Sequence, residues 1–306
     1  MPGTVGRLAP SPTGGLHLGH ARTFLVAWLM ARSHQGEVVL RIEDIDAGRV
    51  RPGTAEVMID DLRWLGLDWD RGPIYQSERL DIYDFALDRL KAADLVYPCT
   101  CTRADIRRAA SAPHAGDEGP TYPGTCAGRS ADDAYSLMRE GRPFAWRFRV
   151  STGEVAWDDL FLGPSRLDPS RVGGDFVVGR STGEPAYQLA VVVDDADMGV
   201  TQVVRGDDLV PSTPRQILLH RALGHEPPQF GHVGLAVGPD GHRLAKRDGS
   251  LRLATLRGAG VAPEVLVGRI AASLGGDGRG SRPWDWVTGL DLVDGARRGW
   301  AVDLGG

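Results

Sequence analysis

The first hundred residues alternate short runs of β-forming residues with longer segments of helical periodicity, and this alternation constrains the fold more than any other feature. Strands are predicted at Val5–Ala9 and Val38–Ile42, with a helix over Leu18–Ser33 between them. Two more helices are predicted at Thr54–Leu65 and Arg79–Ala93. Because a strand, a helix and a second strand in succession form a unit with parallel strands, we expect an α/β chain with a parallel sheet.

An insertion is expected to interrupt this sheet. The stretch 111–128 is rich in Gly, Pro and Ser, as surface loops are, and strands at Ala145–Val150 and Glu154–Leu160 are assigned to the same insertion. The sheet is expected to resume with strands at Asp175–Gly179, Leu189–Val193 and Val200–Val204, before helices at Thr213–Leu223, Leu251–Arg257 and Pro263–Leu274. The predicted parts are therefore a main α/β domain in two halves, 1–96 and 173–240, an insertion, 97–172, and a short helical C-terminal part, 241–306.

The composition fits a folded protein without a membrane segment. Hydrophobic residues make up 42% and charged residues 25% of the 306 residues, and no apolar run approaches the ~18 residues of a membrane helix. The N-terminus has no basic stretch before an apolar core, and three cysteines are too few for a disulfide framework, so we expect a cytoplasmic protein. A net charge of −5 argues against a DNA-coating protein, but a local arginine-rich face can still bind nucleic acid.

The segment Arg7–His20, RLAPSPTGGLHLGH, predicts a site for an anion. A strand enters a Pro/Gly turn, and His17 and His20 follow three residues apart as a helix begins. This spacing places both imidazoles on one face of the first helical turn, where the N–H groups and the helix dipole favour an anion. Gly19 lets a ligand approach the backbone closely. The pattern predicts a phosphate site; the alternative is two solvent-exposed histidines beside a tight turn.

A polar loop far downstream is the expected partner of these histidines. Residues 241–249, GHRLAKRDG, are flanked by glycine and carry Arg243, Lys246 and Arg247. A mobile loop with cations can close over a triphosphate and stabilise the charge that develops there. Lys246 is one of only two lysines among 35 basic residues, and lysine is the compact, mobile cation that suits such a contact. The alternative is an ordinary solvated surface loop.

The two segments resemble the HIGH and KMSKS signatures of class I aminoacyl-tRNA synthetases, here HLGH and RLAKR. The flanking sequence APSPTGGLHLGHART, with LRIEDID at 40–46 and YQLAVVVDDADMGVTQVVRGDDL at 187–209, is similar to the glutamyl/glutaminyl subgroup. The resemblance implies a Rossmann-type parallel sheet and the use of ATP with Mg²⁺. It also implies roles that we list by residue: catalysis by His17, His20 and Lys246, and ATP binding by His17, Gly19, His20, Lys246 and Arg247. Arg243 and Ala245 replace a lysine and a serine of the usual pattern, which leaves serine-dependent loop closure open.

A glutamate ligand needs cations for its two carboxylates and an acid for its ammonium group. Arg7 and Glu43 lie at the ends of predicted strands, where α/β sheets bind ligands, and Arg205 follows a third strand. Together with Ser11 and Tyr187, these residues match the glutamate pocket of the family position by position. The resemblance implies that Glu43 holds the ammonium group and Arg205 the side-chain carboxylate. The alternatives are an Arg7–Glu43 ion pair at a sheet edge and a packing role for Tyr187.

Only about sixty residues follow Lys246, which is too few for the helical anticodon-reading region of a full glutamyl enzyme. The chain therefore resembles the glutamyl-queuosine tRNA(Asp) synthetase family, short paralogues that activate glutamate without tRNA and transfer it to queuosine in the anticodon loop of tRNA(Asp). The expected partners are ATP, L-glutamate and tRNA(Asp), with no DNA and no membrane, and we expect a monomer. Asp207 and Asp208 either lie near the transfer site or face solvent.

Three other functions stay open on the sequence. The first is a shortened glutamyl-tRNA synthetase that charges the 3′ end of tRNA(Glu). The second is a non-catalytic paralogue that binds tRNA or an adenylate. The third is another HxGH nucleotidylyltransferase that acts on a small metabolite.

The cysteines predict one structural zinc. Cys99, Cys101 and Cys126 are the three cysteines of the chain and lie within 28 residues of one another. Tetrahedral zinc needs four ligands, so one ligand is missing, and His114 is the ordinary chemical choice. The CxC…YxxxC pattern of the resembled family instead implies Tyr122 as the fourth ligand, and we favour Tyr122 over His114. The alternative is a group of three reduced thiols without a metal.

Overall fold

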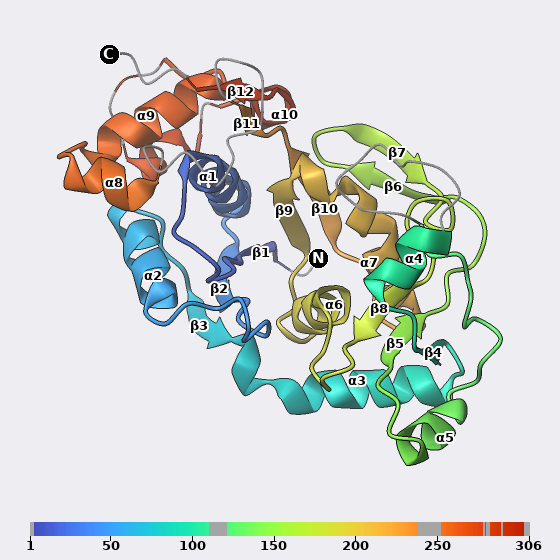
Figure 1. The fold of residues 1–306 in the computed structure, drawn as a ribbon. Coiled ribbons are helices and arrows are strands. Elements are labelled where there is room, and N and C mark those ends of the chain that lie inside the picture. The colour runs from blue at the N-terminus through green and yellow to red at the C-terminus, as the bar shows by residue number, and fades with distance from the viewer. Residues whose placement is uncertain are drawn as a thin grey trace.

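The computed structural model describes residues 3–109, 121–237, 252–277, 279, 282–288 and 290–302. Figure 1 shows the chain running from the blue N-terminal strands, through the green insertion on the opposite side, to the orange and red C-terminal helices that return to the first helix. Within the described residues, no helix combines the length and the apolar character needed to cross a membrane.

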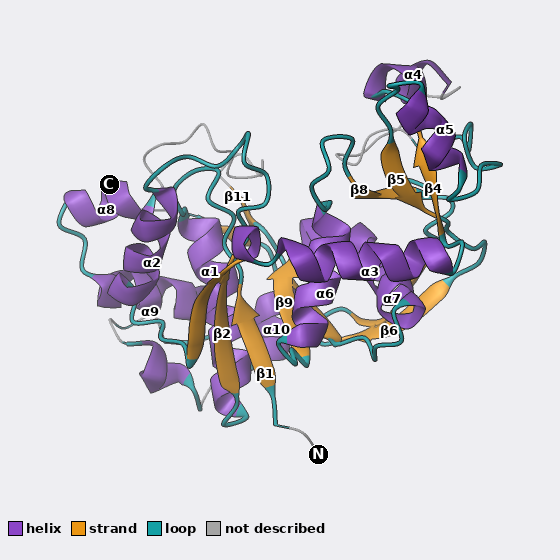
Figure 2. Cartoon of the chain, turned by 90° about the horizontal axis from the view of Figure 1, so that it is seen from below, coloured by secondary structure: helices purple, strands orange, loops and turns teal. Residues whose placement is uncertain are grey.

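The central strands run parallel, as the alternating pattern predicts: β1 (Val5–Leu8), β2 (Glu37–Ile42), β3 (Arg71–Tyr75), β9 (Gln202–Gly206) and β10 (Gln229–Val233). β2 pairs with both β1 and β3, and β9 pairs with β10. The two groups meet where the Thr201 N–H donates to the Val5 carbonyl at 3.0 Å and the Val5 N–H donates to Thr201 Oγ1 at 2.9 Å. Figure 2 shows β2, β1 and β9 side by side. The strand order is therefore β3-β2-β1-β9-β10.

Helices cover both faces of this sheet, which is why its strands are apolar on both sides. Val38, Leu40 and Ile42 of β2 belong to one core cluster with helix α1 (Leu18–Ser33). Val39, which points to the opposite face, packs in a second cluster with residues of β9 and α7 (Thr213–Ala222). Arg41 follows Val39 at the period of two that a strand imposes, so it faces the same side. A charged residue is thereby placed inside the protein.

The remaining helices of the main body are α2 (Thr54–Trp64), α3 (Leu80–Ala92) and α6 (Tyr187–Asp197), with short 3₁₀ turns at Gln76–Glu78 and Asp207–Ser212. The strand predicted at Leu189–Val193 is wrong, because these residues lie within α6. All five side chains are buried, since α6 packs against α3, α7 and β8 (Phe176–Gly179). A short apolar run that is covered all round carries no periodicity, so a buried helix and a buried strand look alike in sequence.

The insertion forms an antiparallel sheet of β4 (Val96–Cys99), β5 (Ala145–Phe148) and β8, flanked by α4 (Arg103–Ala109) and α5 (Asp133–Arg139). The strand predicted at Asp175–Gly179 therefore forms, as β8, but it pairs with β5 and not in the parallel sheet. A hairpin of β6 (Val155–Asp159) and β7 (Gly163–Leu167) returns to the main body. There the Leu160 N–H donates to the Phe230 carbonyl of β10 at 2.8 Å.

The C-terminal region contains β11 (Ala236–Val237), α8 (Leu253–Gly258), α9 (Pro263–Ser273), the 3₁₀ turn Pro283–Trp286, α10 (Leu292–Arg297) and β12 (Trp300–Ala301). One buried guanidinium attaches it to α1. Arg22 donates to the carbonyls of Gly295 at 2.9 Å and Arg298 at 2.8 Å, and to Ser273 Oγ at 3.1 Å. The first helix after the HLGH turn is thus fixed to the end of the chain.

A buried histidine on α7 makes the stability of the fold depend on pH. His220 is 1% exposed and burial lowers its pKa from 6.5 to about 4. Between these values the unfolded chain binds a proton that the folded chain excludes, so stability falls as the pH falls from 6.5 to 4. At pH 5 the loss amounts to about 2 kcal/mol. His220→Leu should therefore gain roughly 2 kcal/mol relative to the wild type on going from pH 7 to pH 5, measured by urea unfolding.

His34→Leu is the control, because this side chain is exposed and is not among the groups that act on His220. It should show no change of relative stability between the two pH values. A His220→Leu variant whose stability difference from the wild type is the same at pH 7 and pH 5 would contradict the buried neutral state of His220.

Candidate active site

The predicted glutamate-pocket residues gather at the carboxyl ends of the parallel strands, where ligands of α/β sheets bind. Arg7 lies in β1, Glu43 directly follows β2, Arg205 lies in β9, and Tyr187 begins α6. Ser11 Oγ donates to Glu43 Oε2 at 3.4 Å. The structure thus brings together, in one place, all five residues that the sequence suggests.

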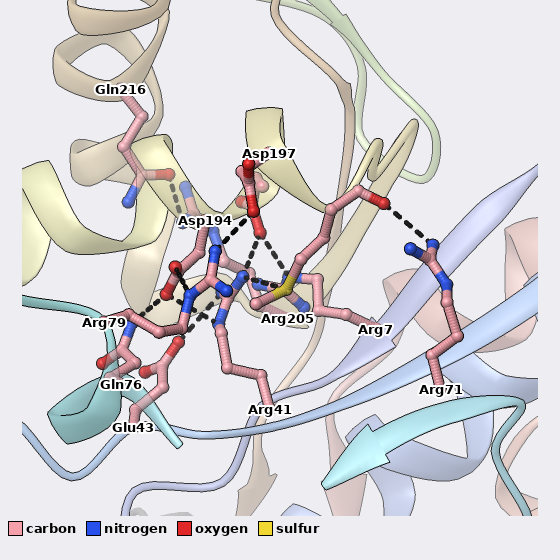
Figure 3. Close-up of polar contacts among 12 residues, drawn as sticks. Arg7, Arg41, Glu43, Arg71, Gln76, Arg79, Asp194, Asp197, Arg205 and Gln216 are labelled. Atoms are coloured by element: carbon pink, nitrogen blue, oxygen red, sulfur yellow. Dashed lines mark hydrogen bonds and ion pairs between the residues drawn. The ribbon is translucent and has the colours of Figure 1, made fainter. Parts of the chain in front are cut away.

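Arg41 of β2 binds the carboxylates of this cluster, and no sequence motif identifies it. Its guanidinium is 0% exposed and contacts three carboxylates: Nη1 to Asp195 Oδ1 at 2.7 Å, Nη2 to Glu43 Oε1 at 3.1 Å, and Nε to Asp194 Oδ2 at 3.7 Å (Figure 3). Burial alone would lower the pKa of Arg41, but the three carboxylates outweigh burial and raise it. Asp195 also lies 3.7 Å from Arg7 Nε, so one carboxylate holds both arginines.

Asp194 links the same cluster to the segment before α3. Its buried carboxylate accepts hydrogen bonds from Gln76 Nε2 at 2.7 Å and Arg79 Nε at 2.9 Å (Figure 3). It also accepts one from the Tyr83 hydroxyl at 2.9 Å. Charged residues at the end of an apolar run, as in VVVDD at 191–195, are the signal that could have identified this network. A charge in such a place must be paired.

The protonation states in the pocket follow from burial and from the neighbouring charges. Burial raises the pKa of Glu43, against the opposing effect of Arg41 and Arg7. Burial and the charge of Glu43 raise the pKa of Tyr187, so its phenol stays protonated and can donate. Burial lowers the pKa of Arg205, but from a value so high that the guanidinium remains charged at neutral pH. The pocket therefore offers guanidinium donors, a phenol donor and one carboxylate.

The guanidinium of Arg205 is held by side chains that sequence reasoning also missed. Nη1 donates to Gln216 Oε1 at 2.7 Å, Nη2 donates to Thr213 Oγ1 at 2.8 Å, and Nε donates to His232 Nε2 at 3.1 Å. Its plane also lies over the Phe230 ring, 5.2 Å from the centroid. Thr213 and Gln216 are three residues apart on α7, which places them on one face of the helix, but no sequence motif identifies them.

The HLGH turn makes the histidine pair expected from the sequence. His17 caps α1: its Nδ1 accepts the Gly19 N–H at 3.1 Å, while His20 Nδ1 accepts the His17 N–H at 3.3 Å. The two rings stack with centroids 3.7 Å apart. Because each Nδ1 is an acceptor, the proton of each neutral ring is on Nε2. A Cβ added to Gly19 would lie 3.0 Å from the ring of His17, so only glycine fits there without displacing the ring.

The predicted loop residues Arg243, Ala245, Lys246 and Arg247 lie outside the described residues, and so does His114. The two ends of the loop are described, and both lie at the histidine turn. Arg252 forms a β-bridge with His17, and a Cβ on Gly19 would lie 3.6 Å from Ala236 Cβ. The described residues on either side of 238–251 therefore lie beside the His17–His20 turn.

Asp207 and Asp208 lie in the 3₁₀ turn directly after β9. The charge of Asp207 acts on Arg22, where it opposes the effect of burial on the pKa of that guanidinium. Asp208 lies beside Gly206, whose added Cβ would collide with Asp208 Oδ1. Their part in any reaction stays a prediction.

The cysteines converge as expected. The sulfur atoms of Cys99, Cys101 and Cys126 lie within 4.8 Å of one another, with Cys101 and Cys126 at 3.7 Å. Two thiolates bound to one tetrahedral zinc are about 3.8 Å apart, so this spacing suits a metal. Tyr122 Oη lies 3.4 Å from Cys99 Sγ and accepts the Cys126 N–H at 2.8 Å. Hydrogen bonds from Thr100, Cys101 and Tyr122 outweigh burial and lower the pKa of Cys126 to about 7, which favours its thiolate. The cluster can hold a metal ion.

The chain is similar to known proteins over most of its length. A family profile described as "tRNA synthetases class I (E and Q), catalytic domain" matches residues 4–275. A relative named glutamyl-Q tRNA(Asp) synthetase from Symbiobacterium thermophilum is 54% identical over 87% of this chain and 85% of its own length. A glutamate–tRNA ligase from a Synechococcus strain is 44% identical over 87% of this chain, but only 56% of that ligase is covered.

Among solved structures, a glutamate tRNA ligase from Elizabethkingia meningosepticum in complex with its amino acid superposes with a TM-score of 0.83 at 27% identity. The match covers 97% of this chain and 66% of the ligase. This chain therefore spans about two thirds of the length of that ligase. The α/β architecture with a parallel sheet, which the sequence predicts, is therefore shared with that ligase.

The Arg41 network should be strongly coupled. Arg41→Met leaves three carboxylates without their shared cation, and the expected loss of stability is about 3–5 kcal/mol. In the double variant with Asp195→Asn one uncompensated charge is gone, so the combined loss should be smaller than the sum of the two single losses by at least about 1 kcal/mol. Urea unfolding of the four proteins measures the coupling.

Arg166→Met is the control, because the Arg166–Glu154 pair is exposed, with side-chain exposures of 75% and 61%. It should change stability by less than about 0.5 kcal/mol. Strict additivity of Arg41→Met and Asp195→Asn would show that the two buried groups do not depend on each other.

Proposed function

The chain belongs to the class I tRNA synthetases of the glutamate and glutamine group and is a ligase of that family, and from this we propose that it activates L-glutamate with ATP and transfers the glutamyl group to queuosine at the wobble position of tRNA(Asp). The observation that carries the proposal is the convergence of Arg7, Glu43, Tyr187 and Arg205 at the strand ends, beside Ser11. Their donors and the single carboxylate complement an amino acid with two carboxylates.

In the proposed pocket, Glu43 binds the ammonium group of glutamate. Its Oε1 is held by Arg41 and its Oε2 by Ser11, so the carboxylate has a fixed orientation before a ligand arrives. Arg205 binds the side-chain carboxylate, the Tyr187 hydroxyl donates to the same ligand, and Arg7 compensates its negative charge. A glutamine side chain would replace the charged oxygen next to Arg205 by an amide nitrogen, and would bind less well.

Activation is an in-line attack of the glutamate α-carboxylate on the α-phosphate of ATP, with pyrophosphate as the leaving group. Mg²⁺ that arrives with ATP supplies positive charge at the phosphates. His17 and His20 donate to the phosphates from Nε2, Gly19 lets the nucleotide approach the backbone, and Lys246 with Arg247 follows the charge of the departing pyrophosphate. The loop ends at Ala236 and Arg252 support this role for Lys246, because they lie beside the histidines.

Sequence identity favours transfer to tRNA(Asp) over a shortened glutamyl-tRNA synthetase. This chain is 54% identical to a relative named glutamyl-Q tRNA(Asp) synthetase and 44% identical to a glutamate–tRNA ligase. When the acceptor is a base of the anticodon loop, the loop itself occupies the active site. Asp207 and Asp208 follow Arg205 on the same strand end and are our candidates for contacts with the attacking hydroxyl.

We further propose that the metal of the cysteine cluster is one structural zinc. Its ligands are Cys99, Cys101, Cys126 and Tyr122, because the Tyr122 oxygen lies 3.4 Å from Cys99 Sγ and accepts the Cys126 N–H. Bound zinc would link β4 to the loop after residue 121 and so stabilise the insertion.

The function is tested with radiolabelled glutamate. We expect glutamate-dependent exchange of pyrophosphate into ATP without any tRNA, and then label on tRNA(Asp) that contains queuosine but not on tRNA(Asp) that lacks it. Glu43→Gln should lower the exchange rate about ten- to a hundredfold, because one charged hydrogen bond to the ammonium group is lost. Glu37→Gln on the same strand is the control, since its side chain is 57% exposed, and it should behave as the wild type.

Three results would contradict the proposal in distinct ways. Label on tRNA(Glu) but not on tRNA(Asp) would favour a glutamyl-tRNA synthetase. No exchange with glutamate would favour a non-catalytic binding protein. Exchange with another small metabolite instead of glutamate would favour a different nucleotidylyltransferase.

The metal is tested by elemental analysis of the purified chain. About one zinc per chain is expected, and Cys126→Ala should lose it and lower the melting temperature. Tyr122→Phe should bind zinc but release it faster to a chelator, whereas Tyr135→Phe, which is 70% exposed, should not. Zinc that is retained equally by the wild type and Tyr122→Phe would remove Tyr122 from the ligand set.

A further inference from the structure

Two buried ionisable side chains near the pocket have no part in the steps above. Asp159 ends strand β6 of the insertion hairpin, and His232 lies in β10; both side chains are 0% exposed. His232 is the direct neighbour of Arg205 in the parallel pairing of β10 with β9. Neighbouring residues of paired strands face the same side, so the histidine lies beside the guanidinium.

We propose that Asp159 and His232 are a positioning pair that fixes Arg205 and thereby sets the preference of the pocket for a side-chain carboxylate. This inference rests on the proposed role of Arg205 in binding glutamate. It assigns to the insertion hairpin a contribution to amino-acid specificity, in addition to any contact with RNA.

The carboxylate of Asp159 is held in its charged form. Its Oδ1 accepts three backbone N–H groups, those of Phe161, Leu162 and His232, each at 3.1 Å. Its Oδ2 accepts a hydrogen bond from His232 Nδ1. Burial alone would raise the pKa of Asp159, but these hydrogen bonds outweigh it and lower the pKa to about 2. The oxygen that faces His232 is thus an acceptor at any ordinary pH.

The acceptor that faces Nδ1 of His232 determines whether the other ring nitrogen, Nε2, donates or accepts a hydrogen bond. Because Nδ1 donates to Asp159, a neutral ring carries no proton on Nε2, which is then an acceptor. That nitrogen accepts the Nε–H of Arg205 at 3.1 Å and lies 3.1 Å from Thr213 Oγ1. Burial lowers the pKa of His232 and outweighs the hydrogen bond to Asp159, which raises it; the charge of Arg205 acts in the same direction as burial, so the ring stays neutral. In the other tautomer, the Nε2–H of His232 would face the Nε–H of Arg205, so two donors would oppose each other.

The pair therefore fixes the one guanidinium nitrogen that the helix residues do not reach. Gln216 accepts from Nη1, while Thr213 and the Leu209 carbonyl accept from Nη2. With Nε held by His232 as well, the plane of Arg205 cannot rotate about its axis without breaking several hydrogen bonds. A fixed plane presents its charge to a ligand carboxylate at low entropic cost and discriminates against an amide.

Asp159→Asn is the most direct test, because it replaces one carboxylate oxygen by an amide nitrogen and leaves the size of the side chain nearly unchanged. The three backbone donors retain the amide oxygen at the Oδ1 position, so the amide nitrogen faces His232 and donates to Nδ1. The ring must then carry its proton on Nε2, facing the Nε–H of Arg205. The KM for glutamate in pyrophosphate exchange should rise about ten- to a hundredfold while the KM for ATP changes less than about twofold.

Two further variants keep the inference testable if Asp159→Asn folds poorly. His232→Gln can place a carbonyl oxygen near Arg205 and should lose less affinity for glutamate than His232→Leu, which has no acceptor. Asp158→Asn is the matched control on the same strand, because its side chain is exposed, and its KM for glutamate should equal that of the wild type. An unchanged KM for glutamate in folded Asp159→Asn and His232→Leu would overturn the inference.

The tautomer is measured independently of activity by NMR of ¹⁵N-labelled imidazoles. The signal that disappears in His232→Gln belongs to His232, among the 8 histidines of the chain. It should show a proton on Nδ1 in the wild type and on Nε2 in Asp159→Asn. A wild-type ring protonated on Nε2 would overturn the inference even if exchange is normal. Absence of glutamate-dependent exchange in the wild type would instead overturn the proposed function and leave the NMR result to decide the pair.

Discussion

The pairing of a fully buried guanidinium with three carboxylates is the interaction on which the rest of the site depends. Arg41 lies in the central strand and cannot reach water, so it requires negative charge from its neighbours. Asp194 and Asp195, at the end of the buried run of α6, supply it together with Glu43. The same contacts fix the position of α6, hold Glu43 at the strand end and place a carboxylate beside Arg7. Stability and ligand recognition therefore have one common origin.

The active site combines a turn that forms locally with side chains from elements that are far apart in the sequence. The HLGH turn is local: a strand end, a tight turn and a helix cap place His17 and His20 together within four residues. The amino-acid pocket is assembled from β1, β2, β9 and α6, and its outermost support, Asp159, comes from the insertion. Because a buried arginine is held by this insertion residue through His232, the hairpin is part of the pocket and not an appendage to it.

Several features follow from local sequence. The helix Leu18–Ser33 forms at the predicted residues, since the N-cap at His17 and the C-cap at His34 directly flank it in the sequence. The parallel pairing of β1 with β2 is confirmed, and it follows from the helix that separates the two strands in the sequence. The sequence predicts a strand at Leu189–Val193, yet these residues lie within α6, because a run that is buried on every side carries no periodicity that distinguishes a helix from a strand. The strand predicted at Asp175–Gly179 forms as Phe176–Gly179 but pairs with β5, because nothing within the strand specifies which edge it joins.

The sequence by itself determined the elements with local causes: the strand–helix alternation, the histidine pair and the cysteine cluster. The five pocket residues were implied by the resemblance to a known family. Only the tertiary structure decided which charges compensate one another. Arg41 meets Asp194 and Asp195 about 154 positions later, and Asp159 meets His232 73 positions later. The physical reason is that an unpaired buried charge costs much free energy and therefore needs a partner. Which residue becomes that partner depends on how distant elements pack, and no local or periodic sequence pattern encodes this.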